Sequence, residues 1–382
     1  MSKWQEVTLS EVAPYWVEKV EAKELHEENY ISADNMLPNK GGIVNSVYVP
    51  VSGKSSSFKP KDILISNIRP YFKKIWFADK NGGCSNDVIV FRANVNVADS
   101  KFIYYCLSNN NFFDYMMAGA NGVKMPRGNK NSIPKYKINL PPLLIQKKIA
   151  KILSNYDDLI ENNLKRIKLL EDSARLVYEE WFLRFRIDGK RLDIDPKSRL
   201  PFGWVFQNLY DLYEIKYGQN LPQTEITESG KYEVYGASGV MGYHNKKNIS
   251  RKVVLITSRG NGSSDIHRTY GESFVTNNSF IVRSNNINLG LNFSIHHLKT
   301  VGLINYCSGS AQPQLTNDAM KNIEIKLPDE ELLRRFNNFA EPLIDTADNL
   351  RYQNKLLKEA RDILLPRLMT GMINTDELDV AV

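Results

Sequence analysis

A long run of polar and apolar residues occurs twice in this sequence, and the duplication constrains the fold more than any other feature. The first copy begins at Leu140 and the second at Leu327, and the same offset of 187 relates Ile149 to Phe336. A constant offset over a stretch of this length indicates an internal duplication.

The apolar residues of both copies advance mostly in steps of three and four, which places one apolar seam along a helix. No Gly or Pro lies between Pro142 and Gly189, which allows an unbroken helix of about 40 residues and about 60 Å. A seam this long needs a partner, and the second copy provides one, so we expect an antiparallel coiled coil. The predicted seam residues are Ile145, Ile149, Ile152, Tyr156, Leu159, Ile167, Leu170, Ala174, Val177 and Trp181 in the first copy, and Leu332, Phe336, Phe339, Leu343, Leu350, Leu357 and Leu364 in the second.

Three residues disturb this pattern. Pro342 and Pro366 lie inside the second copy, and each removes a backbone donor and crowds the preceding turn, so kinks or breaks are expected there. Asn163 falls on the first seam. It either fixes the register of the helix pair or faces water, and the sequence favours neither alternative.

The segments around the two helices are each large enough for a domain. The expected fold class is α+β, with two similar mixed α/β globular domains separated by two long antiparallel coiled-coil helices in a pseudo-two-fold internal repeat. The expected boundaries are 1–140 for the first globular domain, 141–190 for the first helical spacer, 191–328 for the second globular domain and 329–382 for the second spacer.

The globular segments also echo each other. Trp204 matches Trp4 at an offset of 200, and Ile256 matches Ile65 at an offset of 191. Runs rich in Ile, Val and Phe predict short β-strands in both segments, with a turn at residues 81–83 (NGG) in the first.

Charge and composition limit the class of protein. The net charge is +7, and residues 29–140 carry 15 Lys and Arg against 6 Asp and Glu. This bias indicates either a polyanionic partner or an ordinary basic surface. The three cysteines lack paired spacing and the histidines are scattered, so neither disulfides nor a zinc site is expected. No membrane-spanning run or leader is found, which predicts a soluble, cytoplasmic protein.

Motifs for catalysis are absent from the sequence. No dinucleotide-binding, phosphate-loop, zinc-protease or serine-hydrolase pattern occurs. The glycine-rich run at 236–242 predicts a hairpin turn. Glu-x-Lys tripeptides at Glu214–Lys216 and Glu324–Lys326 resemble those of metal-dependent nucleases, but such tripeptides arise by chance in a chain rich in Glu and Lys.

Polar and basic residues gather on loops beside glycine. Arginine can read guanine, and asparagine or glutamine can read adenine, while lysine and serine hold phosphates. Ordinary polar loops remain the plainer interpretation for any one residue, and DNA contact is favoured for the clusters together. The candidates are Arg69, Lys73, Lys74, Lys124, Arg127 and Lys130 in the first segment, with Tyr71 and Phe72 among them, and Arg259, Asn261, Ser263, Ser264, Arg268, Gln312 and Gln314 in the second.

The order of these segments and their duplication resemble the specificity subunits of type I restriction-modification systems. The resemblance covers essentially all of the chain. It rests on SNIRPYFKK with CSNDVIV in the first segment, on ITSRGNG with GSAQPQL in the second, and on helices that begin LPPLLIQKKIAKIL and LPDEELLRRF. The first loop, GVKMPRGN, departs from the Gln-Pro pattern of the second, which predicts that the two half-sites differ.

This resemblance implies that each globular segment is a target recognition domain reading one half of a split DNA target. The helices would hold the halves apart and bind modification subunits, two of which are expected. In such systems the modification subunits methylate adenine at N6 with S-adenosylmethionine, and a restriction subunit, where one is present, uses ATP and Mg²⁺ to cleave DNA. The chain itself is then a non-catalytic reader without a cofactor. The alternatives are a stand-alone DNA-acting enzyme and a coiled-coil scaffold that binds no DNA.

Overall fold

The computed structural model describes residues 4–122, 124–237, 239–260, 262–309 and 312–375. The chain forms two compact units. The first unit comprises residues 1–161 and 354–382, and the second comprises residues 162–353. Each long helix therefore begins in one unit and ends in the other.

The first unit is a mixed α/β structure. Its central antiparallel sheet has the order β6-β5-β8, and a second sheet has the order β2-β4-β7-β3. Strand β5 is buried along its whole length, as its run of Ile and Leu predicts. The elements are β1 (Gln5–Thr8), α1 (Leu9–Val12), β2 (Lys19–Glu21), η1 (Ala22–Glu24), β3 (Tyr30–Ile31), β4 (Lys54–Phe58), β5 (Ile63–Ser66), η2 (Pro70–Phe72), β6 (Ile75–Phe77), β7 (Gly82–Cys84), β8 (Val88–Phe91), α2 (Ser100–Ser108), α3 (Asn110–Ala118), η3 (Ile133–Lys135), β9 (Lys137–Leu140) and the start of α4 (Leu143–Tyr178).

The second unit is also a mixed α/β structure, with its own set of sheets and helices. Its sheets have the orders β13-β19-β16-β17, β15-β14-β18 and β12-β20. The elements are η4 (Glu179–Leu183), β10 (Arg186–Ile187), β11 (Lys190–Arg191), β12 (Val205–Asn208), α5 (Leu209–Leu212), β13 (Tyr213–Tyr217), η5 (Gln223–Glu225), β14 (Tyr232–Gly236), β15 (Gly239–His244), β16 (Val254–Thr257), β17 (Ile266–Arg268), β18 (Ser273–Val275), β19 (Ser279–Ser284), η6 (Ile287–Leu289), α6 (Leu291–Thr300), η7 (Leu303–Tyr306), α7 (Asn317–Met320), β20 (Glu324–Leu327) and α8 (Glu330–Met369).

Strand register confirms the duplication. In the first unit Ile65 pairs with Ile89, and in the second Ile256 pairs with Phe280. The residue numbers of both partners therefore differ by 191 between the two units. The β1–β9 ladder in the first unit has the same register as the β12–β20 ladder in the second, at offsets of 200 and 187. The offsets read from the sequence therefore mark equivalent places in two separately folded units.

One predicted turn is wrong. Residues 82–84 form strand β7, which pairs with β4 and β3. A Cβ atom on Gly82 would lie 2.1 Å from the carbonyl oxygen of Asn29, so glycine here permits close approach of two backbones within a sheet. The predicted hairpin around residues 236–242 is confirmed, because β14 and β15 pair antiparallel there.

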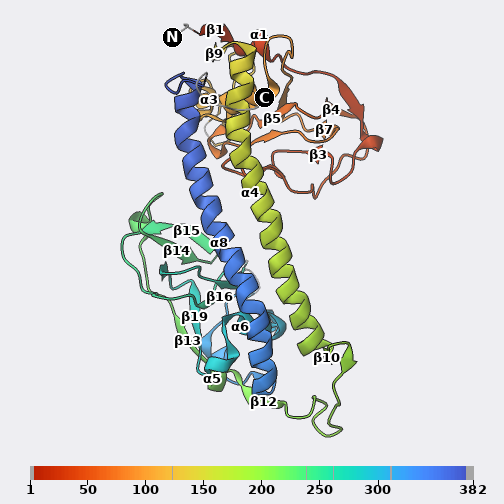
Figure 1. Ribbon diagram of the computed structural model, residues 1–382, viewed down its shortest axis with the longest axis vertical. Helices are drawn as coiled ribbons and strands as arrows, with labels where there is room; N and C mark the ends of the chain where they lie inside the picture. Colours follow the sequence, from red (N-terminus) through yellow and green to blue (C-terminus); the bar gives the residue numbers. More distant parts are fainter. Residues whose placement is uncertain (1–3, 123, 238, 261, 310–311, 376–382) are drawn as a thin grey trace. The chain divides into compact units, whose positions relative to one another are not determined.

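The two long helices are confirmed. Helix α4 continues into one turn of π-helix, η4, and α8 is continuous over 40 residues (Figure 1). The predicted breaks at Pro342 and Pro366 are absent. Each proline lacks the N–H that would bond to the carbonyl four residues earlier. Burial of Ala340 and Ile344, which flank Pro342, offsets that loss.

The apolar seam differs in detail from its prediction. Leu159 is 51% exposed while its neighbour Ile160 is buried, and Phe339 is 42% exposed while Ala340 is buried. Counting steps of three and four cannot separate the centre of a seam from its edge. Asn163 is buried at 6% exposure, so it does not face water.

Within each unit, segments of α4 and α8 contact each other. In the first unit the Arg361 guanidinium lies 2.6 Å from the Asp157 carboxylate, and in the second Arg351 lies 2.6 Å from Glu171. Both contacts join one residue of α4 to one of α8. Ionic contacts therefore tie the helix segments together in each unit.

Candidate nucleic-acid interface

In the first unit, the loop after β5 is joined to the loop before β9 by backbone hydrogen bonds. The Arg69 amide donates to the Pro126 carbonyl at 2.7 Å, and the Gly128 amide donates to the Asn67 carbonyl at 3.0 Å. We call residues 67–74 and 119–130 the first loop pair. The two basic clusters predicted from the sequence thus lie on one surface.

The second unit joins the equivalent loops in the same way. The Gly260 amide donates to the Pro313 carbonyl at 3.2 Å, and the Leu315 amide donates to the Ser258 carbonyl at 2.9 Å. The residue numbers in these bonds are those of the first loop pair plus 191 in the first loop and plus 187 in the second loop. We call residues 258–265 and 306–315 the second loop pair, and it presents Arg259, Gln312 and Gln314 together.

A glycine allows the same turn in both loop pairs. Gly122 has φ +93° and Gly309 has φ +89°, a conformation that glycine adopts without steric cost. The turns are closed by the β-bridges Asn121–Arg127 and Ser308–Gln314. A Cβ atom on Gly309 would lie 2.8 Å from the Gln312 carbonyl oxygen, so glycine is required there.

A third loop completes each site, and the sequence analysis did not assign it a role. The Asn67 amide donates to the Asp87 carbonyl at 2.7 Å, and the Ser258 amide donates to the Asn278 carbonyl at 2.8 Å. Adding 191 to both residue numbers of the first bond gives the residue numbers of the second. The match of Asn86 with Asn277 at this offset was a signal that could have found this loop.

The cations of the first loop pair differ in their exposure. Lys124, Arg127 and Lys130 are exposed. Arg127 lies 3.1 Å from Asp87, and both side chains are about half exposed. Exposed ion pairs contribute about 0–1 kcal/mol, so Arg127 can exchange Asp87 for another acceptor. The Lys130 ammonium donates to the Asn86 carbonyl at 3.3 Å.

Arg69 carries an unpaired donor. Its side chain is half-buried, and its Nε has no hydrogen-bond partner among the described residues. A buried donor without an acceptor is unusual in proteins and is suited to an acceptor supplied by a ligand. Lys73 and Lys74 are half-buried beside it, and Lys74 donates to the Ala33 carbonyl at 2.6 Å.

The second loop pair presents fewer cations and more amides. Arg259 and Gln312 are exposed and Gln314 is half-buried, while Asn261 lies outside the described residues. Ser264 has φ +75° and is half-buried. A guanidinium and two carboxamides are groups that read base edges.

Two predicted contacts need correction. Ser263 is 2% exposed, and its hydroxyl donates inward to the Ser258 carbonyl at 3.3 Å. The Arg268 side chain is 8% exposed and forms an ion pair with Asp348 of α8. Since neither group faces solvent, both support the structure and are left out of the candidate interface.

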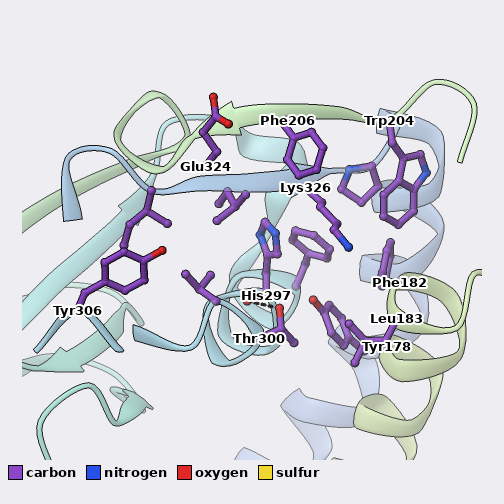
Figure 2. Close-up of a pocket in the computed structure, with 15 residues that line it drawn as sticks. Tyr178, Phe182, Leu183, Trp204, Phe206, His297, Thr300, Tyr306, Glu324 and Lys326 are labelled. Carbon is purple, nitrogen blue, oxygen red and sulfur yellow. Dashed lines mark hydrogen bonds between the residues drawn. The ribbon is translucent and has the colours of Figure 1, made fainter. Parts of the chain in front are cut away.

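Elsewhere in the second unit, a pocket of about 260 Å³ lies between α6, the end of α4 and the β12–β20 sheet. Phe182, Trp204 and Phe206 line it together with the polar side chains of Lys326 and His297 (Figure 2). Burial lowers the pKa of His297 to about 4, so its imidazole is neutral near pH 7. The pocket contains none of the predicted interface residues.

The first of the two Glu-x-Lys tripeptides takes part in ion pairs. Glu214 of the first Glu-x-Lys tripeptide pairs with Lys216 and with Arg283. Within the residues that are described, no group of three His, Cys, Asp or Glu side chains is arranged to hold a metal ion.

None of the described helices is both long enough and apolar enough to cross a bilayer.

Comparison with known proteins identifies relatives that match most of the chain. The sequence profile of the family described as type I restriction modification DNA specificity domain matches residues 1–172 and again residues 201–350. The chain is 25% identical over 315 residues to the type I restriction enzyme MjaIX specificity subunit of Methanocaldococcus jannaschii, which covers 73% of this chain and 70% of the relative.

A second relative and a solved structure match nearly end to end. The type I restriction enzyme HindI specificity subunit of Haemophilus influenzae is 23% identical over 467 aligned residues, covering 98% of this chain and all of the relative. The crystal structure of a type I restriction-modification S subunit from M. genitalium matches with a TM-score of 0.59 at 20% identity, over 96% of each chain. That structural likeness supports the two-domain fold.

Proposed function

Because the chain belongs to the family of type I restriction-modification DNA specificity proteins, we propose that its two loop pairs each read one half of a split DNA target. The observation that carries this proposal is the repeated set of backbone hydrogen bonds, Arg69 to Pro126 and Gly260 to Pro313. One backbone frame thus displays different side chains in the two units.

The side chains on this frame suit DNA. In the first loop pair, Lys124, Arg127 and Lys130 are exposed cations, which would hold phosphates or read guanine. In the second, Arg259 and Gln312 could read guanine and adenine respectively. Since cations dominate one loop pair and amides the other, the two half-sites would have different sequences.

The long helices would set the distance between the half-sites. Helices of 36 and 40 residues extend about 55–60 Å, more than one turn of duplex DNA, about 34 Å. We propose that α4 and α8 pair antiparallel as a coiled coil along their length. Support comes from the contacts of Asp157 with Arg361 and of Glu171 with Arg351, because the partner residue number falls as the α4 number rises in these pairs.

Apolar side chains outside the seam of α4 suit partner subunits. Exposed leucines recur along the helix away from the buried positions, and they are 49–67% exposed. Exposed apolar side chains on a long helix offer contacts that another protein could cover. We propose that modification subunits bind here and at the outer face of α8. The exposed leucines of α4 are Leu144, Leu159, Leu164, Leu169 and Leu176.

The chemistry would belong to those partners. Modification subunits would bind S-adenosylmethionine and methylate adenine at N6, and a restriction subunit, where present, would use ATP and Mg²⁺ to cleave DNA. This chain would select the site at which both act.

Co-expression with a candidate modification subunit, followed by mapping of methylated adenines, tests the proposal. A split motif that changes in one half when residues of one loop pair are replaced is expected. Methylation or cleavage by this chain alone would instead identify a stand-alone enzyme. Normal assembly with no preference for any duplex would identify a scaffold.

A further inference from the structure

A strained turn carries two aromatic side chains at the centre of the first loop pair. The 3-10 turn η2, Pro70–Phe72, is flanked by Arg69 at φ +50° and Lys73 at φ +51°. Residues with a side chain seldom adopt this left-handed conformation, and it persists only where the surroundings hold it. Such strain is typical of sites that must present a group in one orientation.

Backbone hydrogen bonds hold the turn on both sides. The Arg69 amide donates to the Pro126 carbonyl at 2.7 Å. On the other side, the Asn39 amide donates to the Phe72 carbonyl at 2.8 Å and the Lys40 amide donates to the Lys73 carbonyl at 3.0 Å. Two separate segments of the first unit, one containing Pro126 and one containing Asn39 and Lys40, therefore fix this one turn.

The turn displays an apolar surface among cations. Tyr71 is 46% exposed and Phe72 is 37% exposed, and their ring centroids are 4.7 Å apart with an interplanar angle of 54°. The Lys74 ammonium lies 5.6 Å from the centroid of Phe72. Two exposed rings are costly in water, and the cations beside them favour a polyanion as the molecule that covers them.

The second loop pair has no equivalent. At the offset of 191 that relates the two units, Tyr71 corresponds to Gly262 and Phe72 to Ser263, which is 2% exposed. The backbone frame is shared, but the aromatic pair is confined to the first unit.

We propose that Tyr71 and Phe72 form a wedge that inserts between two base pairs of the half-site read by the first unit, opening one base step and bending the duplex. The inference rests on the proposed function and adds a contact that is not a base-edge hydrogen bond. Apolar and aromatic side chains that enter a base step unstack it and kink the helix. The neighbouring lysines hold the phosphates on either side.

This wedge gives the first unit a second way to select sequence. Pyrimidine–purine steps such as TA and CA/TG open more easily than others. The first half-site would therefore contain such a step at the wedge even where no side chain contacts the base edges. The second half-site would carry no such requirement.

The test uses the full chain in complex with its modification subunits and duplexes that contain the mapped target. 2-Aminopurine, whose fluorescence rises when it is unstacked, replaces in turn each adenine other than the methylated ones, because a methyltransferase itself flips its target base out of the stack. We compare the wild type with Tyr71→Ala/Phe72→Ala, with the conservative variant Tyr71→Phe, and with Phe202→Ala. Phe202 is an aromatic residue of the second unit that is 65% exposed, and its replacement controls for the loss of an exposed ring.

A fluorescence rise of severalfold at one step of the first half-site is expected in the wild type, in Tyr71→Phe and in Phe202→Ala, and its loss in the double alanine variant. Persistence of the rise in that variant overturns the wedge. Specific methylation by the wild type with a flat fluorescence profile across both half-sites also overturns it, and leaves the proposed function intact. Absence of any specific DNA binding overturns both. Equal thermal melting of all variants excludes unfolding as the cause of a lost signal.

Discussion

Replacement of Asp348 by Asn removes the carboxylate at the centre of a buried ionic cluster in the second unit. Arg268 donates to Asp348 through both terminal nitrogens, and Lys252 lies 2.8 Å from it and Arg351 3.1 Å. The side chains of Arg268 and Asp348 are 8% and 10% exposed. The cluster ties strand β17 and the segment before strand β16 to α8, so Asp348→Asn should loosen the sheet on that helix.

The expected loss in the free energy of unfolding follows from the charge that remains unpaired after the replacement. Removal of one partner of a buried ion pair leaves an uncompensated charge and costs about 3–5 kcal/mol. Here the guanidinium of Arg268 loses its main acceptor, and Glu171 at 4.0 Å replaces it poorly. We expect the free energy of unfolding of the second unit to fall by about 3 kcal/mol or more. The double replacement Arg268→Met/Asp348→Leu should restore part of this loss, because apolar substitutes remove the unpaired charge.

Hydrogen exchange measured by mass spectrometry separates the two units. Amides of β16 and β17 should exchange faster in Asp348→Asn, while those of β5 in the first unit should keep the wild-type rate. The exposed pair of Arg334 with Glu331 gives a matched control, since Glu331→Gln should leave exchange unchanged. Wild-type exchange in β17 of Asp348→Asn, or equal acceleration in both units, would refute the structural role of the cluster.

The same cluster predicts a pH dependence. Burial raises the pKa of Asp348, but hydrogen bonds and charges from Arg268 and Lys252 outweigh it, so the net pKa lies below its ordinary value. A carboxylate with a lowered folded-state pKa contributes stability that is present above its unfolded pKa, about 3.9, and is lost as pH falls through the folded pKa. Asp348→Asn should remove this acid-dependent part of the stability of the second unit.

Three further predictions follow from the charges and burial of named groups. DNA affinity measured by fluorescence anisotropy should fall with salt, with a log–log slope of about −0.9 per phosphate neutralised, and a flat response would count against a DNA interface. Gln312→Ala should relax adenine selection in one half-site by about 1–3 kcal/mol, and equal weakening on all sequences would indicate a phosphate contact instead. His297 has a pKa of about 4 through burial, against about 6.5 unfolded. Because the unfolded chain takes up the proton first, the second unit should lose stability as pH falls from 6.5 towards 4 in urea titrations. His297→Gln should reduce that slope without abolishing it, because burial also lowers the pKa of His296 to about 4.

The architecture could be predicted from the sequence because the two copies of the duplication can be compared with each other, position by position. Offsets of 200, 191 and 187 describe equivalent strands and loops, and the register of Ile65 with Ile89 and of Ile256 with Phe280 obeys them. Helix length followed from the absence of Gly and Pro in the first copy. The continuity of α8 through Pro342 could not be predicted, because local propensity contains no information on the packing that offsets a missing hydrogen bond.

The candidate interface could be predicted only as sets of loops. Arg259, Ser263 and Arg268 are close in sequence, yet one is exposed, one is buried in its own loop and one pairs with Asp348 of another element. Proximity along the chain does not determine which way a side chain points. The partner of Arg268 lies 80 residues away, and no spacing rule connects them.

Under the proposed function, the two loop pairs would allow a duplicated protein to read two unlike half-sites. The bonds from Arg69 to Pro126 and from Gly260 to Pro313 involve only backbone atoms, so they survive almost any change of side chain at exposed positions. Because the frame does not depend on the side chains that it displays, each loop pair can change its contacts without refolding its unit. The same backbone frame thus displays cations and an aromatic pair in one unit and amides in the other. On the proposed function, specificity on such a frame could diverge while the helices, which would keep binding the same partners, retain their duplicated sequence.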